Sequence, residues 1–349
     1  MDDTGTLLRS LAAAANLDWV GFAPVGAART WESYRAWLAQ GYAGAMEYLA
    51  RPDALARRAD PRALMPSAKS VIVAAAGYTR EALPPLLPLH GRVARYAWGA
   101  DYHRWVLQRL EQFTRLLAEA LGHLEARCYV DTGPILEREW AVTAGVGWQG
   151  KNTCLLNPQL GSFFFLGVIL ADRELQPAPV PDFPTCGSCT RCLDACPTGA
   201  LIAPGVLDAR RCLSYLTIEH RGAIPEPFRS LMGEHVFGCD ICQEVCPWNQ
   251  RAQVAPKGIP DLSPFHTTLV LPELLSLNAE EFRARFRPTA LWRATPEGLA
   301  RNAAVVLGNL RDPAASPVLE WAAREHSSAL VREHAAWALS AIPNMKPLT

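Results

Sequence analysis

The sequence predicts a mixed α/β domain over residues 1–176, a cysteine-rich module over 177–270 and an all-α segment over 271–349. Three observations predict this division. Apolar strands and helices alternate in the first part, eight cysteines lie close together in the second, and alanine-rich helical patterns fill the third. With 50% hydrophobic and 19% charged residues among 349, the chain has enough apolar material for real cores, which excludes extensive disorder.

The first part contains short apolar segments of both periodicities. Helical spacing predicts helices at 7–15 and 103–121. Continuous apolar runs predict strands at 71–78, 128–130 and 162–170. The glycine-rich residues 144–152 are typical of a loop that faces a ligand, and the proline-rich residues 176–184 mark the clearest boundary in the chain.

The last part contains two similar stretches, 299–308 and 331–340, at an offset of 32 residues. This period is close to that of HEAT-like helical pairs. Two copies of an alanine-rich amphipathic helix align easily, however, so an ordinary pair of helices is the alternative.

Charge and targeting signals restrict the partners. The 34 basic and 34 acidic side chains cancel, so a nucleic-acid partner would have to bind a local patch. The N-terminus has no basic region followed by an apolar one, and the longest apolar run, 163–171, is too short to cross a bilayer. We therefore expect a cytoplasmic monomer without a membrane partner.

The cysteines carry the strongest motif. Cys128 and Cys154 stand alone and are interpreted as structural thiols, whereas the other eight lie between 186 and 246. Their C-x2-C-x2-C-x3-C-P spacing is typical of ferredoxins with two [4Fe–4S] clusters, in which the fourth cysteine of a run binds the other cluster. A pair of zinc sites is the alternative. The crossed assignment gives one cluster Cys186, Cys189, Cys192 and Cys246, and the other Cys196, Cys212, Cys239 and Cys242.

One acid in the first part is a candidate for catalysis. Asp131 follows a short apolar strand and precedes a turn, a position from which carboxylates in α/β folds reach a ligand crevice. Burial there would raise the pKa of Asp131 and allow it to donate a proton. The alternative is an Asx-turn or a cap of the helix predicted near Pro134.

Five segments together resemble the epoxyqueuosine reductase family, over nearly the whole chain. They are VDTGPILER at 130–138, AGVGWQGKN at 144–152, GSFFFLG at 161–167, RCLSYLTIE at 211–219 and GCDICQEVCPWN at 238–249. The resemblance implies an oxidoreductase that reduces epoxyqueuosine to queuosine at the wobble position of tRNA. It also implies a cobalamin-binding α/β domain related to reductive dehalogenases, a two-cluster ferredoxin-like module and a HEAT-like tRNA-binding domain.

The resemblance further implies roles for individual residues. Electrons from an external low-potential donor would pass through the clusters to cobalamin, and Asp131 would be the proton donor. The implied cobalamin contacts are Arg58, Asp131, Leu155, Leu166, Ile241 and Cys242. The fragment Asp101-Tyr-His103 resembles the start of a cobalt-ligand motif, but Val106 replaces its glycine, so we interpret Asp101 as a helix cap.

A tRNA stem-loop requires cations, and the C-terminal part has nine from Arg283 onward against five anions. The candidate tRNA contacts are Arg210, Arg211, Ser214, Arg293 and Arg301. Two alternative functions remain at this point. One is a cobalamin-dependent reductive dehalogenase, which usually carries a twin-arginine signal, and the other is a non-catalytic electron-transfer ferredoxin, which would leave the first domain without a role.

Overall fold

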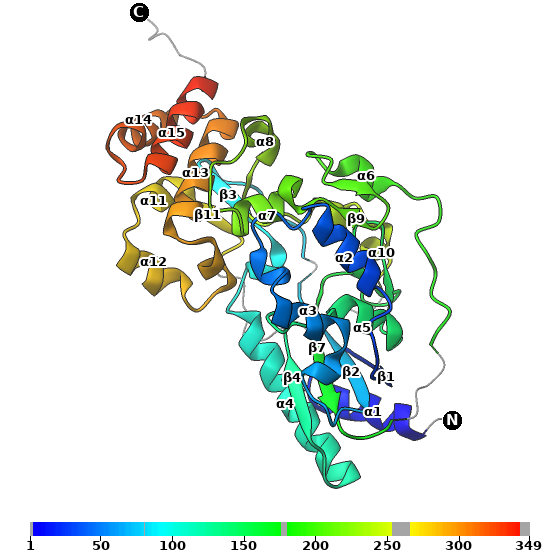
Figure 1. Cartoon of the computed structure of the whole chain (residues 1–349). Helices are drawn as coiled ribbons and strands as arrows, with labels where there is room; N and C mark the ends of the chain where they lie inside the picture. Colours follow the sequence, from blue (N-terminus) through cyan, green and yellow to red (C-terminus); the bar gives the residue numbers. More distant parts are fainter. Residues whose placement is uncertain (1–2, 80, 176–179, 253–265, 343–349) are drawn as a thin grey trace, which may run out of the picture.

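The protein was analysed as a computed structural model, which describes residues 3–79, 81–175, 180–252 and 266–342. The molecule is elongated: a four-stranded sheet and the N-terminus lie at one end, and the last helices lie at the other (Figure 1). The first four residues of the predicted proline-rich linker fall outside the described residues. Within the described part, no helix combines the length and the apolar character that crossing a bilayer requires.

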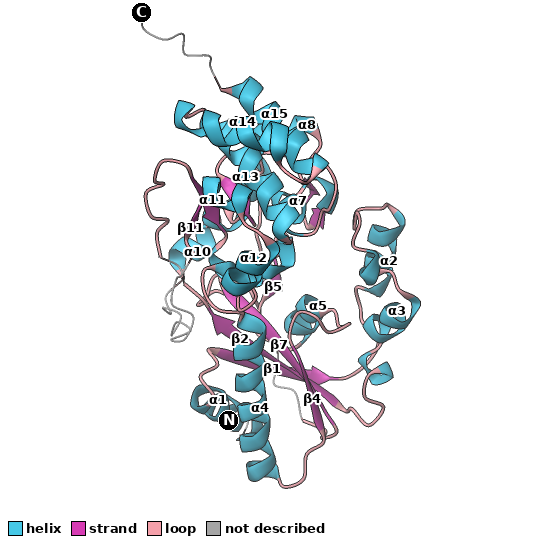
Figure 2. Ribbon diagram, turned by 90° about the vertical axis from the view of Figure 1, so that its left-hand side faces the viewer, coloured by secondary structure: helices cyan, strands magenta, loops and turns pink. Residues whose placement is uncertain are grey.

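The four-stranded sheet forms the core of the first part. Its order is β1 (Trp19–Pro24), β2 (Ser70–Gly77), β7 (Phe164–Ala171) and β4 (Ala126–Tyr129). Helices α1 (Asp3–Ala14) and α4 (Tyr102–Leu121) cover one face, and α5 (Glu137–Thr143) covers the other (Figure 2). The layers agree with the predicted α/β domain, but every neighbouring pair of strands is antiparallel, so the sheet lacks parallel βαβ crossovers.

The central strand β2 is buried on both faces of the sheet. All eight of its residues are buried. Val71 and Val73 pack on the α5 side, whereas Ile72 and Ala74 pack on the side of α1 and α4. A strand covered on both faces has no polar alternation, and this is why it was visible in the sequence as a continuous apolar run.

A second sheet joins the first predicted part of the chain to the second. Strand β3 (His90–Val93) pairs in parallel with β10 (His235–Phe237) and in antiparallel fashion with β11 (Thr268–Val270). Two short hairpins, β5 (Trp148–Gln149) with β6 (Leu155–Leu156) and β8 (Leu201–Ala203) with β9 (Val206–Leu207), complete the strands. Residues on both sides of the predicted boundary at 270/271 share one hydrophobic core, which reaches from Val93 to Ile342.

Short helices fill the middle of the molecule. Before the cysteine-rich part come α2 (Trp31–Ala39) and α3 (Pro52–Ala59). Within it lie α6 (Arg191–Ala195), α7 (Leu213–Ile218), α8 (Glu226–Arg229), α9 (Ile241–Glu244) and α10 (Pro247–Arg251).

The C-terminal part is helical, as predicted. Its helices are α11 (Leu271–Ser276), α12 (Ala279–Phe286), α13 (Pro296–Leu310), α14 (Ser316–Glu325) and α15 (Ala329–Ala341). The two similar stretches lie in α13 and α15, which pack on each other. They meet at small residues: a Cβ on Gly308 would lie 2.7 Å from the Cα of Ala338, so only glycine permits this approach.

The position of Arg301 differs from the one expected for a tRNA contact. It was a candidate for contact with tRNA phosphates, but its side chain is fully buried in α13. Its guanidinium donates to the carbonyl oxygens of Leu216, His220 and Gly222 at 2.7–2.8 Å and to Oδ1 of Asn302. These bonds satisfy backbone acceptors around the end of α7, so Arg301 fixes the helical part to the cysteine-rich part.

We expect Arg301→Met to destabilise the fold. The substitution removes the donor from three backbone carbonyl groups, of which that of Leu216 is buried, and a buried acceptor left without a donor costs about 1–3 kcal/mol. The midpoint of thermal unfolding, followed by circular dichroism on the cluster-loaded protein, should fall by several degrees. Arg324→Met, which removes an exposed arginine of α14, is the matched control. Equal midpoints for the two variants would contradict the structural role of Arg301.

Candidate active site

Asp131 lies at one edge of the four-stranded sheet. Strands β2 and β4 end at this edge and β7 begins there, because Gly77 pairs with Phe164 and Tyr129 with Val168. The backbone of Asp131 has φ 53°, a left-handed conformation that aspartate adopts more readily than most residues. Its side chain is 61% exposed, so the carboxylate faces an accessible space.

His103 connects Asp131 to a second carboxylate. It lies in the first turn of α4, where the carboxylate of Asp101 accepts a hydrogen bond from its backbone N–H at 3.0 Å. The imidazole Nδ1 lies 2.6 Å from Oδ1 of Asp101, and Nε2 lies 3.1 Å from Oδ2 of Asp131. Helix α5 begins only at Glu137 with Leu136 as its cap, so Asp131 does not cap that helix.

The expectation of a raised pKa at Asp131 is wrong. Burial does raise the pKa, but the hydrogen bond and the charge of His103 outweigh it, with smaller contributions from Tyr102 and Arg293. The pKa of Asp131 therefore lies below its ordinary value. Burial lowers the pKa of His103, but its hydrogen bonds to Asp101 and Asp131 and their charges raise it to about 9.

Glu137 is the unusual acid of this site. Burial and the nearby charge of Asp131 raise its pKa to about 8, although its Oε1 accepts a 2.7 Å hydrogen bond from the backbone N–H of Asp131. At neutral pH one carboxyl of the pair is therefore ionised and the other mostly protonated. Glu137 fixes the backbone that carries Asp131.

Tyr96 marks the point where three parts of the chain meet. Burial raises its pKa far above the ordinary value, and the charges of Asp131, Asp240 and Glu219 raise it further, while Arg293 lowers it. The phenol of Tyr96 thus interacts with residues from all three parts of the chain. They are Asp131 from the first, Asp240 and Glu219 from the cysteine-rich part, and Arg293 from the C-terminal part.

The rim of the site is built from an arginine, a glutamate and a tyrosine. Arg293 donates to both carboxylate oxygens of Glu219, at 2.9 and 3.0 Å, and its guanidinium lies 5.5 Å from the centre of the Tyr48 ring. Both Arg293 and Tyr48 remain exposed. Positive charge and an aromatic face are therefore available beside Asp131.

Two neighbourhoods can be recognised among the clustered thiols. Burial first, and then the nearby Cys186 and Cys246, raise the pKa of Cys192. Burial, with Cys212 and Cys196 nearby, raises the pKa of Cys239 to about 12. Cys246 thus lies near Cys186 and Cys192 although it is distant from them in sequence, and the crossed assignment stays a prediction.

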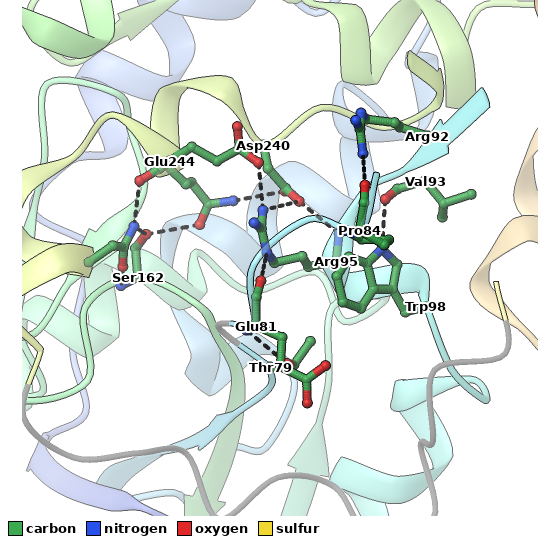
Figure 3. A network of polar contacts seen from close by, with 12 residues as sticks. Thr79, Glu81, Pro84, Arg92, Val93, Arg95, Trp98, Ser162, Asp240 and Glu244 are labelled. Atoms are coloured by element: carbon green, nitrogen blue, oxygen red, sulfur yellow. Dashed lines mark hydrogen bonds and ion pairs between the residues drawn. The ribbon is translucent and has the colours of Figure 1, made fainter. Parts of the chain in front are cut away.

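A buried arginine holds the turn that carries Cys239 and Cys242 (Figure 3). The backbone N–H of Arg95 donates to Oδ2 of Asp240 at 2.7 Å, and its guanidinium donates to Oε1 of Glu244 at 2.7 Å and to Asp240 at 3.4 Å. Asp240 lies between the two cysteines, so these bonds fix the turn against the first part of the chain.

The glycine-rich loop at 144–152 also contacts this turn. Nδ2 of Asn152 donates to the carbonyl oxygen of Cys242 at 3.2 Å. Cys154, interpreted from the sequence as a structural thiol, hydrogen-bonds to the Cys242 side chain. Cys128 lies elsewhere, 3.5 Å from the hydroxyl of Thr114.

The predicted cobalamin contacts fall in three environments. Leu155 is buried in β6, Leu166 is partly exposed in β7, and Ile241 and Cys242 are partly exposed in the turn just described. Arg58 is the informative one. Its side chain is mostly buried, its Nη1 donates to the carbonyl oxygen of Leu49 at 3.5 Å, and its guanidinium lies 5.9 Å from the centre of the Tyr34 ring.

A guanidinium has five N–H donors, so Arg58 can donate to a ligand in addition to Leu49. Cobalamin carries a phosphate and several amide groups, and either could accept hydrogen bonds from Arg58. The chemistry of this residue therefore fits the cofactor that the family resemblance implies.

The remaining tRNA candidates lie at the surface. Arg210 is exposed, forms a two-bond pair with Asp208 at 2.8–2.9 Å and lies 5.5 Å from the centre of the Tyr42 ring. Arg211 and Ser214 are partly exposed nearby. Arg210 and Arg293 thus each stack on a tyrosine of the segment that follows α2, whereas Arg301 is buried.

Sequence reasoning missed His103, Tyr96, Arg95 and the contact of Cys154 with Cys242. The Asp101-Tyr-His103 fragment resembles an incomplete cobalt-ligand motif in the sequence, which does not indicate a role beside Asp131. Its signal was the aspartate two residues before the histidine, which orients the ring. Nothing in the sequence linked that ring to Asp131, 28 residues further on.

Comparisons with known proteins agree on one family. A model described as epoxyqueuosine reductase QueG, DUF1730, matches residues 58–132, and one described as a 4Fe-4S double cluster binding domain matches 185–249. Epoxyqueuosine reductase from Pseudomonas aeruginosa is 45% identical over 87% of this chain and 84% of its own length. The enzyme from Xanthomonas campestris is 41% identical over 97% of this chain and 96% of its own length.

Solved structures extend the agreement to the fold. An epoxyqueuosine reductase bound to an epoxyqueuosine-modified tRNA-Tyr stem loop has a TM-score of 0.86 and 30% identity, covering 97% of this chain and 91% of its own. The structure from Streptococcus thermophilus has a TM-score of 0.89 and 28% identity, covering 100% of this chain and 92% of its own.

Proposed function

The chain belongs to the epoxyqueuosine reductase family, and we propose which of its residues deliver the proton, hold the cofactors and bind the tRNA. It is an oxidoreductase that reduces epoxyqueuosine to queuosine in tRNA. The relatives do not favour the two alternatives, a reductive dehalogenase and a non-catalytic ferredoxin. The convergence of Asp131, Asp240 and Arg293 on Tyr96 carries the proposal, because it joins the acid, a cysteine turn and a surface arginine at one place.

The reaction defines what the site has to provide. Converting an epoxide to an alkene consumes two electrons and two protons, and the oxygen leaves as water. Asp131 is the proton donor in this proposal, because its carboxylate is exposed at the sheet edge and hydrogen-bonded to a charged histidine. Protonation of the departing oxygen avoids the formation of a high-energy alkoxide.

The electrons enter through the 4Fe-4S double-cluster domain. We assign its ligands by the crossed scheme, with Cys246 completing the 186–192 set and Cys196 completing the set of 212, 239 and 242. An external low-potential donor reduces these clusters. Cobalamin, when bound, supplies a low-potential cobalt centre to the substrate. Arg58, Asp131, Leu155, Leu166, Ile241 and Cys242 are the residues proposed to hold it.

The tRNA is proposed to bind over the rim of the site. Arg210 and Arg293, each stacked on an exposed or partly exposed tyrosine, offer cations for phosphates and ring faces for unstacked anticodon bases. Arg211 and Ser214 extend this surface. The helices α13–α15 are proposed to be a HEAT-like domain of residues 271–349 that supports it, beside a cofactor domain at 1–176 and a cluster domain at 177–270, in a monomer.

We expect Arg210→Glu combined with Arg293→Glu to weaken tRNA binding. Each arginine that contacts a phosphate contributes about one to the slope of log K against log salt. The double variant should therefore have a lower affinity and a slope smaller by about two, with iron content unchanged. Fluorescence anisotropy of a labelled stem-loop measures both, and Arg324→Glu is the control. An unaltered slope would show that Arg210 and Arg293 do not contact the tRNA backbone.

One anaerobic assay tests the proposed function. Protein reconstituted with iron, sulfide and cobalamin is incubated with a low-potential reductant and tRNA that contains epoxyqueuosine. Nucleoside mass spectrometry should then show queuosine formed, and omission of cobalamin should abolish its formation. Full turnover without cobalamin would contradict the cofactor assignment, and no turnover with fully loaded protein would contradict the function.

A further inference from the structure

The state of the site raises a question about the source of the proton. The proposed donor, Asp131, has a pKa below its ordinary value, so at neutral pH it is a carboxylate without a proton. An ionised carboxylate cannot protonate the departing oxygen. The proton has to reach Asp131 from a neighbour during the reaction.

The geometry identifies that neighbour. The imidazole of His103 lies between two carboxylates, with Nδ1 2.6 Å from Asp101 and Nε2 3.1 Å from Asp131. A neutral imidazole has one N–H and could donate to only one of them, whereas an imidazolium donates to both. Two acceptors on opposite ring nitrogens therefore favour the charged ring.

We propose that His103 stores the proton that Asp131 delivers to the departing oxygen, and that Asp101 holds the ring in position for this transfer. His103 is thus a positioning and relay residue that acts through Asp131, and the proposal rests on the function assigned to Asp131 above. The proton moves from Nε2 of His103 to Oδ2 of Asp131 and from there to the oxygen.

The balance of the step is complete. The two electrons come from the clusters, one of the two protons passes through His103 and Asp131, and the other comes from water. The imidazole is left neutral, with Nδ1–H still donating to Asp101. Solvent then returns the proton, because the side chain of His103 is 29% exposed.

The surrounding charges favour the stored proton. The titratable and charged groups around the pair include Asp101, Tyr102 and Arg104 at the start of α4, and Glu137 at the start of α5. Tyr48, Tyr96 and Arg293 also lie near Asp131. Of these, Asp101 hydrogen-bonds to the ring and Tyr102 stacks on it with the ring centres 4.1 Å apart, whereas Arg293 pairs with Glu219. His103 accordingly keeps its proton until the pH approaches about 9.

The pH dependence of single-turnover reduction tests the relay. In the wild type the rate should stay level through neutral pH and fall as the pH rises through about 9, where His103 loses its proton. In His103→Gln, which can still donate a hydrogen bond, Asp131 has to be protonated directly. Its ordinary pKa is about 3.9, so the rate of this variant should fall about tenfold per pH unit across the neutral range.

Two further variants sharpen the comparison. Asp101→Asn removes one negative charge from the ring, so the decline should move to lower pH than in the wild type. His123→Gln, at an exposed histidine beyond the end of α4, should leave the profile unchanged. Iron content and tRNA affinity are measured on every variant, because a merely structural role would alter these and not the shape of the profile.

The outcomes separate the relay from the proposed function. A wild-type profile in His103→Gln, with Asp131→Asn inactive, would overturn the relay and leave Asp131 as the donor. Full activity in Asp131→Asn would overturn the donor assignment itself. A shifted pH profile in His103→Gln, together with no activity of Asp131→Asn at any pH, would support both the relay and the donor assignment.

Discussion

Asp131→Asn is expected to lower the single-turnover rate of epoxide reduction by about 10²–10⁴-fold, the usual contribution of a general acid. The amide has nearly the same shape as the carboxylate but cannot transfer a proton from His103 to the substrate. Iron content and tRNA affinity should remain near those of the wild type, because the side chain is exposed and its interactions are confined to one edge of the sheet. Quench-flow sampling with nucleoside mass spectrometry measures the rate.

The matched control is Asp182→Asn, which changes an exposed aspartate in the proline-rich segment. It should reduce the substrate at the wild-type rate. If Asp131→Asn retained a rate within a few-fold of the wild type, Asp131 would only be the residue that shapes its turn. The acid of the reaction would then have to be sought elsewhere, with the protonated Glu137 as the next candidate.

Cys246→Ala is expected to abolish turnover and to remove up to half of the iron. With eight thiolates and two [4Fe–4S] clusters, each cluster has four ligands, so the loss of one ligand damages one cluster. In the crossed scheme that cluster is the one held by the 186–192 run. Iron analysis and electron paramagnetic resonance of the reduced protein measure the loss, and Cys128→Ala is a control that should retain all of the iron.

Double variants decide which cluster Cys246 serves. Cys246→Ala with Cys189→Ala removes two ligands from the same cluster, so the second cluster should survive with about four irons. Cys246→Ala with Cys239→Ala removes one ligand from each and should damage both. The opposite ranking of the two double variants would show that the assignment is not crossed.

Features that depend on neighbouring residues in the chain were predictable from the sequence. The helix predicted at 103–121 is α4 to within one residue at its start, and the buried strands at 71–78 and 162–170 correspond to β2 and β7. Local periodicity reports directly which faces of a segment are covered. The cysteine spacing was equally informative, because the ligand geometry of a cluster is encoded within a few residues.

Features that depend on contacts across the chain were not predictable. The pKa of Asp131 was expected to rise with burial, but it is lowered instead by His103, which lies in α4. Arg301 looks like any cation of an amphipathic helix, and only the carbonyl groups of another segment show why it is buried. The antiparallel order of the sheet likewise depends on pairings between strands far apart in sequence.

The sheet of β10, β3 and β11 constrains how the protein can be made. Strand β3 is translated long before either of its partners, so it leaves the ribosome with both edges unpaired and stays so until residues 235–237 and 268–270 have emerged. Assembly of the acid-bearing and cluster-bearing parts is therefore a late event of synthesis. For the same reason the electron-transfer part cannot be excised as an independent module: cutting the chain after residue 249 would remove β11 and the helices that complete the shared core.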